Sequence, residues 1–129
     1  MRLLLDTHVL IWIVMAPDRV GAKARAAIAA DGAEVYASHV SLWEIAIKRR
    51  LGKLEQIDRP ALDWFRRCGA GSSLRQLPLH GEHLGAGEAL PHLHGDPFDR
   101  LLVAQTAREH MTIVTQDDLV TQYDIATIW

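Results

Sequence analysis

Three features are scarce or missing in this sequence: cysteine, an excess of positive charge, and long apolar runs. The single cysteine, Cys68, cannot form a disulfide within the chain, which is typical of a protein from a reducing cytoplasm. The formal net charge of −2 excludes a polybasic nucleic-acid binder, so contact with nucleic acid would need local basic clusters or a bound metal. Asp6 and His8 interrupt the apolar N-terminal stretch, which argues against a signal peptide or a membrane span.

Length and composition indicate one domain with one substantial core. The chain has 129 residues, of which 49% are hydrophobic and 23% charged, as in an ordinary soluble globular protein. No repeat or low-complexity segment occurs. The glycine- and serine-rich stretch at 69–73 is a loop rather than a domain boundary, because too little chain lies on either side of it. We expect a single domain over residues 1–129.

Apolar patterning predicts strands that alternate with helices. The expected strands are residues 3–5, 34–38, 74–79, 112–115 and 125–129. The expected helices are residues 7–15, 22–30, a segment from Ser38 or Ser41 to Arg50, 60–67, 81–90 and 97–110. This alternation is typical of an α/β layer fold with a mainly parallel sheet.

Two acidic residues follow predicted strands. Asp6 ends the run Leu3 to Leu5, and Asp117 comes two residues after Thr115. In an open parallel sheet, functional residues gather just beyond the carboxyl ends of the strands, so the two carboxylates are expected at one edge. The alternative is that each residue only caps the helix that follows it.

Glu44 lies inside an apolar helical stripe. Val40, Trp43, Ile47 and Leu51 recur at helical spacing, and position 44 falls on the same face. A surface glutamate belongs on the opposite face, so we expect a functional carboxylate or, alternatively, an ion pair with a buried Lys or Arg. The helix is apolar nearly all round, which also fits packing against a second subunit.

The segment from Asp96 to Arg100 opens a predicted helix. Asp96 suits the N-cap, Pro97 the first helical position, and Asp99 the third, an acidic variant of the capping box. Asp96 is therefore an auxiliary candidate for metal binding or only a cap, whereas Asp99 is the stronger candidate ligand. Arg100 is a candidate phosphate contact or a solvated side chain.

Several poorly solvated carboxylates in one domain need a cation, because an unpaired buried charge costs several kcal/mol or neutralises itself. Gathered at one place, they describe an oxygen-lined site for a hard divalent metal. A metal-bound water would supply hydroxide near neutral pH for phosphodiester hydrolysis. The sequence therefore predicts a metal-dependent nuclease.

Four segments together carry a family resemblance. They are Leu-Leu-Asp-Thr-His at 4–8, Ser-Leu-Trp-Glu-Ile at 41–45, Asp-Pro-Phe-Asp-Arg-Leu-Leu-Val-Ala-Gln at 96–105 and Thr-Gln-Asp at 115–117. In this combination the whole chain resembles the PIN-domain family and, within it, the VapC-like toxins of type II toxin–antitoxin pairs. The resemblance implies a three-layer α/β/α sandwich, a Mg²⁺- or Mn²⁺-dependent ribonuclease, a cognate antitoxin as partner, and a homodimer.

Carried over by position, the resemblance implies catalytic and metal-binding roles for four acids, with Asp96 as an auxiliary ligand: Asp6, Glu44, Asp99 and Asp117. Thr7 and Thr115 lie beside this site and are candidates, with Arg100, for contact with substrate or for orienting a ligand or water. His8 is a departure, because many PIN domains carry Asn two residues after the first Asp. Six basic residues are further candidates for substrate contact, or alternatively only form solvated helix faces: Lys48, Arg49, Arg50, Lys53, Arg66 and Arg67.

Three alternatives stand beside the nuclease. A zinc site would use the histidine-rich stretch His80, Glu82, His83, Glu88, His92 and His94, although its spacing matches no closed ligand pattern. A non-catalytic α/β interaction module would use the acids only as helix caps and ion pairs. An aspartate-nucleophile phosphatase is disfavoured, because the sequence lacks a second Asp two residues after Asp6.

Overall fold

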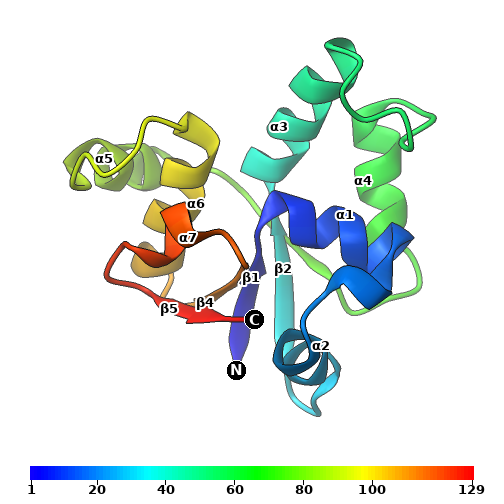
Figure 1. Ribbon diagram of the computed structural model, residues 1–129, viewed down its shortest axis with the longest axis horizontal. Helices are drawn as coiled ribbons and strands as arrows, with labels where there is room; N and C mark the ends of the chain where they lie inside the picture. The colour runs from blue at the N-terminus through cyan, green and yellow to red at the C-terminus, as the bar shows by residue number, and fades with distance from the viewer.

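The computed structural model describes residues 1–129 and contains one five-stranded sheet between helices (Figure 1). Every strand pairing is parallel, and the strand order is β3-β2-β1-β4-β5. The strands are β1 (Arg2–Leu5), β2 (Glu34–Ser38), β3 (Arg75–Leu77), β4 (Thr112–Val114) and β5 (Ala126–Ile128). The helices are α1 (Thr7–Met15), η1 (Pro17–Arg19), α2 (Ala22–Ala29), α3 (His39–Arg50), α4 (Ala61–Gly69), α5 (Gly81–Ala89), α6 (Pro97–Arg108) and α7 (Asp118–Thr121).

The leucines of β1 are buried on both faces of the sheet. Leu3 and Leu5 belong to a core that includes residues of α1, α2 and α4, whereas Leu4 belongs to a second core with residues of α6 and α7. Successive side chains of a strand point to opposite faces, so a continuous apolar run is what a doubly covered strand needs. Burial of each leucine contributes about 1.5–3 kcal/mol. The predicted three-layer α/β/α sandwich with a parallel sheet is confirmed.

The strand order reverses between β1 and β4. From β1 the chain adds β2 and β3 on one side, then returns to the other side for β4 and β5. Loops at such a switch point diverge to opposite faces of the sheet and leave a crevice beyond the carboxyl ends of the strands. The residues that follow β1 and β4 therefore line the crevice.

Most predicted elements are present, with differences at their ends. Strand β3 is shorter than predicted, and Pro78, which has no backbone N–H to donate, follows it directly. The hydroxyl of Ser38 accepts a hydrogen bond from the Val40 N–H, so Ser38 rather than Ser41 caps α3. The sequence did not predict η1 or α7, which are too short to show a periodic pattern. None of the helices is long and apolar enough to cross a bilayer.

The predicted apolar stripe of α3 is wrong in two positions. Trp43 and Leu51 are each 62% exposed, while the buried residues of this helix are Val40, Ser41, Glu44 and Ile45. The prediction counted apolar residues around a helix that is apolar on nearly every side, so spacing alone did not separate the inner face from the outer one. Glu44 nevertheless lies on the buried face, as predicted.

Candidate metal centre

Three carboxylates from distant parts of the chain converge. One oxygen each of Asp6, Asp99 and Asp117 lies within 4.8 Å of the other two. Asp6 directly follows β1, Asp117 lies beyond the end of β4, and Asp99 is in the first turn of α6. The convergence expected at the edge of the sheet therefore occurs. No second group of three such ligand residues occurs anywhere in residues 1–129.

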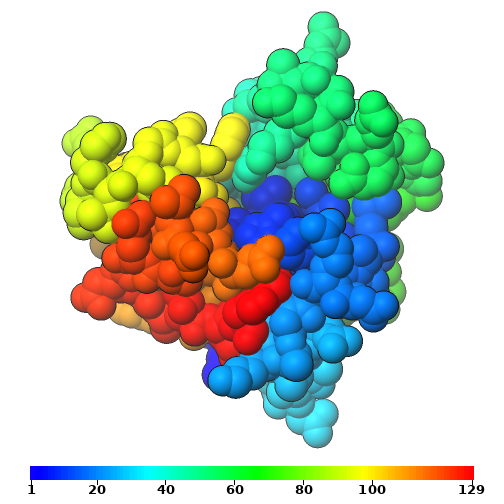
Figure 2. Space-filling view, viewed as in Figure 1, coloured from blue at the N-terminus to red at the C-terminus, as the bar shows by residue number.

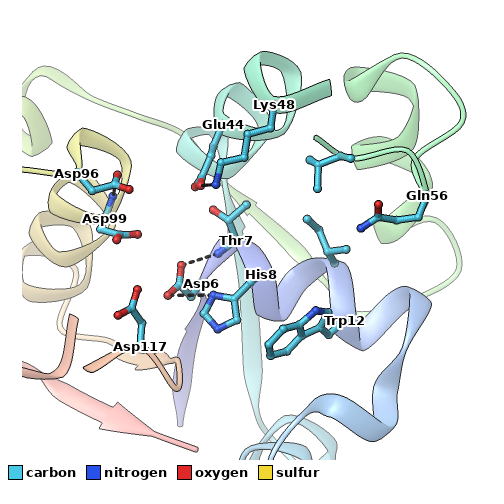
Figure 3. A pocket seen from close by; sticks show the side chains of 12 residues that line it. Asp6, Thr7, His8, Trp12, Glu44, Lys48, Gln56, Asp96, Asp99 and Asp117 are labelled. Carbon is cyan, nitrogen blue, oxygen red and sulfur yellow. Dashed lines mark hydrogen bonds and ion pairs between the residues drawn. The ribbon is translucent and has the colours of Figure 1, made fainter. Parts of the chain in front are cut away.

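The three carboxylates line a cavity of about 250 Å³. In the space-filling view the cavity lies over the dark blue atoms, with the yellow and orange segments on one side and the green segment on the other (Figure 2). Figure 3 shows that Asp96 and Asp99 approach from one side and that Glu44 and Lys48 of α3 approach from another. The other residues lining the cavity are Thr7, His8, Ile11, Trp12, Leu54 and Gln56.

Three of the cavity acids are also helix N-caps. Asp6 accepts a hydrogen bond from the Thr7 N–H at the start of α1, and Asp117 accepts one from the Leu119 N–H at the start of α7. Asp96 accepts from both N–H groups of Phe98 and Asp99 in α6. The cap interpretation is therefore confirmed for these three acids, and capping does not prevent them from lining one cavity. The partial positive charge of the helix N-termini helps to hold carboxylates close together.

Asp6 is fixed from both sides. It is only 2% exposed. Its Oδ1 accepts the Thr7 N–H at 2.7 Å, and its Oδ2 accepts the Thr115 hydroxyl at 2.7 Å. Strand register explains the second contact: Leu5 pairs with Val114, so the next residues of β1 and β4 are neighbours. Thr115 also accepts the Asp117 N–H at 3.0 Å, and so it positions two of the acids.

Burial and repulsion between acids make Asp99 and Asp6 hard to ionise. Burial raises the pKa of Asp99 to about 8, with further contributions from the nearby charges of Asp6, Asp96, Asp117 and Glu44. Burial also raises the pKa of Asp6 above its ordinary value, although His8 and the Thr115 hydrogen bond oppose the effect. A divalent cation at this position would restore ionisation and remove the repulsion.

Glu44 lies in the same cavity but outside the three-acid group. It is 4% exposed, and its Oε2 forms an ion pair with Lys48 one turn later on α3. Burial disfavours the charge of Lys48, but the hydrogen bond and charge of Glu44, together with Asp96 and Asp99, raise the pKa of Lys48. The other oxygen, Oε1, is buried and has no hydrogen-bond partner. The ion pair that the sequence left open is thus present, and half of the carboxylate is still unsatisfied.

The donor set fits a hard divalent cation. All candidate ligand atoms are carboxylate oxygens, the type preferred by Mg²⁺ and Mn²⁺, and no thiolate lines the cavity. The close approach of three acids and the unpartnered Oε1 of Glu44 both indicate a position where a cation would be stabilised. His8 lies beside this set, with Nδ1 at 3.5 Å from Oδ2 of Asp6. The histidine thus occupies the place next to the first acid that the resemblance assigns to Asn.

The three residues suggested for substrate contact have other partners. The Thr7 hydroxyl pairs with the Ser41 hydroxyl and joins α1 to α3, and the Thr115 hydroxyl holds Asp6. The Arg100 guanidinium donates to the carbonyls of Gly87, Leu90 and Pro91 and to the Tyr123 hydroxyl. It does not line the cavity. In this structure Arg100 braces backbone carbonyls outside the cavity, and its contact with phosphate stays a prediction.

The histidine-rich stretch does not assemble a zinc site. His83 is fully buried between the backbone of His80 and the Glu109 carboxylate. His94 instead contacts the metal-centre residue Asp99, with Nε2 3.4 Å from Oδ2. Sequence reasoning missed this role. The only sign of this contact in the sequence is the short separation of His94 and Asp99. The two side chains meet because the loop between them folds back.

Comparisons with known proteins agree with this fold. The sequence model of the PIN domain matches residues 3–126. The VapBC2 structure from Rickettsia felis, bound to a promoter DNA fragment, is similar with a TM-score of 0.71 and 15% identity over 99% of this chain and 98% of that chain. A toxin–antitoxin complex from Klebsiella pneumoniae is similar with a TM-score of 0.65 and 12% identity over 98% of this chain and 95% of that chain. FitAcB from Neisseria gonorrhoeae is similar with a TM-score of 0.59 and 18% identity over 98% of this chain and 96% of that chain. No curated protein matched the sequence.

Proposed function

This chain belongs to the PIN domain family, and from that premise we propose that it is a metal-dependent endoribonuclease, the toxin of a type II toxin–antitoxin pair. The observation that carries the proposal is the convergence of Asp6, Asp99 and Asp117 at the switch point of the sheet. Mg²⁺ or Mn²⁺ is the proposed cofactor, because the three converging ligand residues are all carboxylates.

A bound divalent ion would lower the pKa of a bound water and polarise the scissile phosphodiester. The protein's own part is to hold the ligands: Asp6 through Thr7 and Thr115, and Asp117 through its cap at α7. Glu44 would use its unpartnered Oε1 to bind or orient water. Hydrolysis adds the water oxygen to phosphorus and breaks the bond to O3′, which leaves a 5′-phosphate and a 3′-hydroxyl.

The toxin assignment is supported by the kind of structure that this chain resembles. Structures with a similar fold include a toxin–antitoxin complex from Klebsiella pneumoniae, beside VapBC2 and FitAcB. We therefore propose a cognate antitoxin as partner, RNA as substrate and the cytoplasm as the place of action. We also propose a homodimer that uses the outer face of α3, where Trp43 and Leu51 are exposed. A second copy would remove this apolar surface from water.

A non-catalytic interaction module is the second candidate, because three of the acids cap helices and Glu44 pairs with Lys48. In such a module the convergence of the acids would only destabilise the fold. The two candidates differ in their response to a divalent ion. A nuclease needs the ion for cleavage, whereas a module of caps and ion pairs has no RNA-cleaving activity with or without it.

The test is RNA cleavage by the purified protein in Mg²⁺ and in EDTA. Adjacent acids offer a matched pair of variants: Asp117→Asn removes a charge from the centre, and Asp118→Asn removes an exposed charge one residue away. We expect cleavage by wild type and Asp118→Asn in Mg²⁺, loss of at least about 100-fold in Asp117→Asn, and no cleavage in EDTA. Equal activity of the two variants, or cleavage that persists in EDTA, would overturn the proposal.

A further inference from the structure

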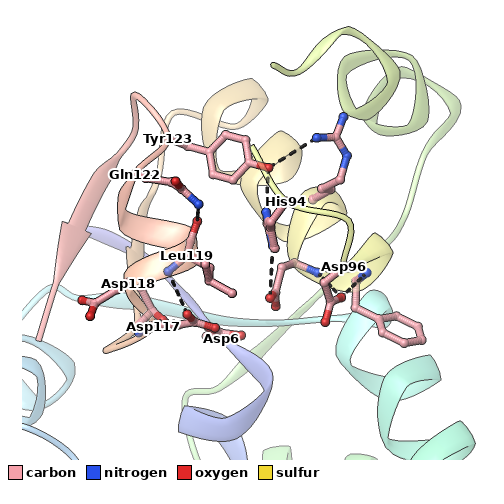
Figure 4. Close-up of polar contacts among 12 residues, drawn as sticks. Asp6, His94, Asp96, Asp117, Asp118, Leu119, Gln122 and Tyr123 are labelled. Carbon is pink, nitrogen blue, oxygen red and sulfur yellow. Dashed lines mark hydrogen bonds and ion pairs between the residues drawn. The ribbon is translucent and has the colours of Figure 1, made fainter. Parts of the chain in front are cut away.

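A chain of hydrogen bonds leads from the C-terminal segment to the metal centre. Nε2 of His94 lies 3.4 Å from Oδ2 of Asp99, and Nδ1 of His94 lies 2.8 Å from the Tyr123 hydroxyl (Figure 4). The Tyr123 hydroxyl in turn accepts a hydrogen bond from Nη1 of Arg100 at 3.3 Å. The side chains of His94 and Asp99 are 9% and 13% exposed, and Tyr123 is buried. These contacts thus lie mostly out of competition with water.

The direction of these hydrogen bonds follows from Arg100. A guanidinium is always a donor, so the Tyr123 oxygen accepts from it, and the Tyr123 hydroxyl proton is available for donation to Nδ1 of His94. Nδ1 is then the acceptor nitrogen, and the ring carries its proton on Nε2. Nε2 faces Asp99 and donates to its carboxylate. The arrangement therefore favours the neutral tautomer of His94 that offers Asp99 a hydrogen bond.

Asp99 has no other side-chain donor. Asp6 receives hydrogen bonds from Thr7 and Thr115, and Asp117 caps α7, whereas the Asp99 carboxylate is contacted by His94 alone. Four neighbouring acids repel it: Asp6, Asp96, Asp117 and Glu44. A carboxylate so placed would turn away from the cavity unless something held it. His94 is in the position to do so.

We propose that His94, held in one tautomer by Tyr123 and Arg100, is a positioning residue that aligns the Asp99 carboxylate for divalent metal binding. This inference rests on the proposed function. Residues that orient metal ligands in this way typically change metal affinity by about 10–100-fold when they are removed. Sequence alone suggested His94 only as one ligand of a zinc site, which is a different role.

The experiment measures Mn²⁺ affinity by titration calorimetry in the absence of RNA, with wild type, His94→Ala, His94→Gln and His92→Ala. His92 is an exposed residue of the same loop and serves as the matched control. We expect His94→Ala to weaken binding by about 10–100-fold and His92→Ala to leave it within about twofold. His94→Gln, whose amide can donate in place of Nε2, should recover part of the loss. Tyr123→Phe, which removes only the hydroxyl, should weaken binding less than His94→Ala.

A structural effect is separated from a positioning effect by urea unfolding in EDTA. A positioning role predicts that His94→Ala and His94→Gln have similar unfolding midpoints without metal but differ in Mn²⁺ affinity. Unchanged affinity in His94→Ala, or equal loss in His94→Ala and His94→Gln, would overturn the inference while the metal centre stands. Failure of the wild type to bind Mn²⁺ would overturn the inference and the proposed function together.

Discussion

The hydroxyl of Thr115 donates a hydrogen bond of 2.7 Å to Oδ2 of Asp6, and both side chains are almost fully buried. Valine has nearly the same shape as threonine but no hydroxyl, so Thr115→Val removes this donor and leaves Asp6 held by the Thr7 N–H alone. We expect Mn²⁺ affinity to fall by on the order of tenfold. Unfolding in EDTA should become easier by about 1–3 kcal/mol, because the Asp117 N–H also loses its acceptor. Titration calorimetry and urea denaturation measure the two effects.

Thr106→Val is the control for this prediction. Thr106 is equally buried, but its hydroxyl donates to the Leu102 carbonyl within α6, away from the cavity. The Thr106→Val variant should change the free energy of unfolding and leave the Mn²⁺ affinity unchanged. If both valine variants bound Mn²⁺ as the wild type does, Thr115 would have no role in holding Asp6 for metal.

Stability of the metal-free protein should depend on the ionisation of Asp99. Its pKa is raised from 3.8 in the unfolded chain to about 8 in the folded protein, mainly by burial. The folded state therefore holds this proton more tightly, and its stabilising effect is complete below pH 3.8 and is lost as pH rises through about 8. Metal-free wild type should become less stable across this interval, and saturating Mg²⁺ should reduce the loss.

Asp99→Asn isolates this contribution, because asparagine keeps the shape and cannot ionise. In EDTA near pH 8, the variant should be more stable than wild type by at least about 1 kcal/mol, equivalent to roughly one pKa unit. Near pH 4 the difference should shrink. Chemical denaturation across this pH range measures this difference in the free energy of unfolding. If the stability of the two proteins depended on pH in the same way, Asp99 would not belong to a repulsive carboxylate cluster.

The ion pair between Glu44 and Lys48 should be coupled energetically. Lys48→Met leaves the buried Glu44 carboxylate without its cation and among other acids, which should destabilise the metal-free protein by about 1–2 kcal/mol. The partly exposed Lys48 side chain keeps this cost below that of a fully buried pair. Glu44→Gln combined with Lys48→Met should recover stability, as a double-mutant cycle would show. Additive effects would mean that the pair contributes nothing to the fold.

Glu44→Gln and Asp6→Asn should differ in Mn²⁺ affinity, but both should lose RNA cleavage. Asp6 belongs to the three-acid group and Glu44 does not. We expect Asp6→Asn to abolish Mn²⁺ binding and RNA cleavage. Glu44→Gln should lose cleavage while it retains much of the Mn²⁺ affinity. Calorimetry alongside an RNA cleavage assay separates the two roles, and full cleavage by either variant would refute its place in the active site.

The outer face of α3 should govern oligomeric state. Trp43→Glu places a charge on this exposed apolar surface and should convert a dimer to a monomer without unfolding it. Leu119→Glu, at another exposed apolar residue, is the control and should leave the dimer intact. Light scattering after gel filtration distinguishes the outcomes. A wild-type protein that is already monomeric would end the homodimer proposal.

The sequence predicted those parts of the site that depend on local position. Asp6 and Asp117 could be placed because each follows an apolar strand of a parallel sheet, where the carboxyl ends share one edge. Asp99 could be placed because Pro97 marks the start of its helix. Burial of Glu44 followed from helical spacing, although the stripe used to argue it contained the exposed Trp43.

The remaining features depend on contacts between distant segments. The bond from Thr115 to Asp6 needs the register of β1 against β4, and no local pattern shows which residues of two strands face one another. His94 reaches Asp99 only because the loop before α6 folds back and Tyr123 packs beside it. The partners of Arg100 are backbone carbonyls, which a sequence cannot single out.

The most direct test of the metal centre is a crystal structure with Mn²⁺ and an anomalous difference map. The account predicts a peak in the cavity bound by carboxylate oxygens of Asp6, Asp99 and Asp117 at roughly 2.0–2.3 Å. The peak should be absent from crystals of Asp99→Asn. Mn²⁺ bound elsewhere, or no peak at saturating Mn²⁺ with the cavity open to solvent, would contradict the central claim that these three acids hold a divalent ion.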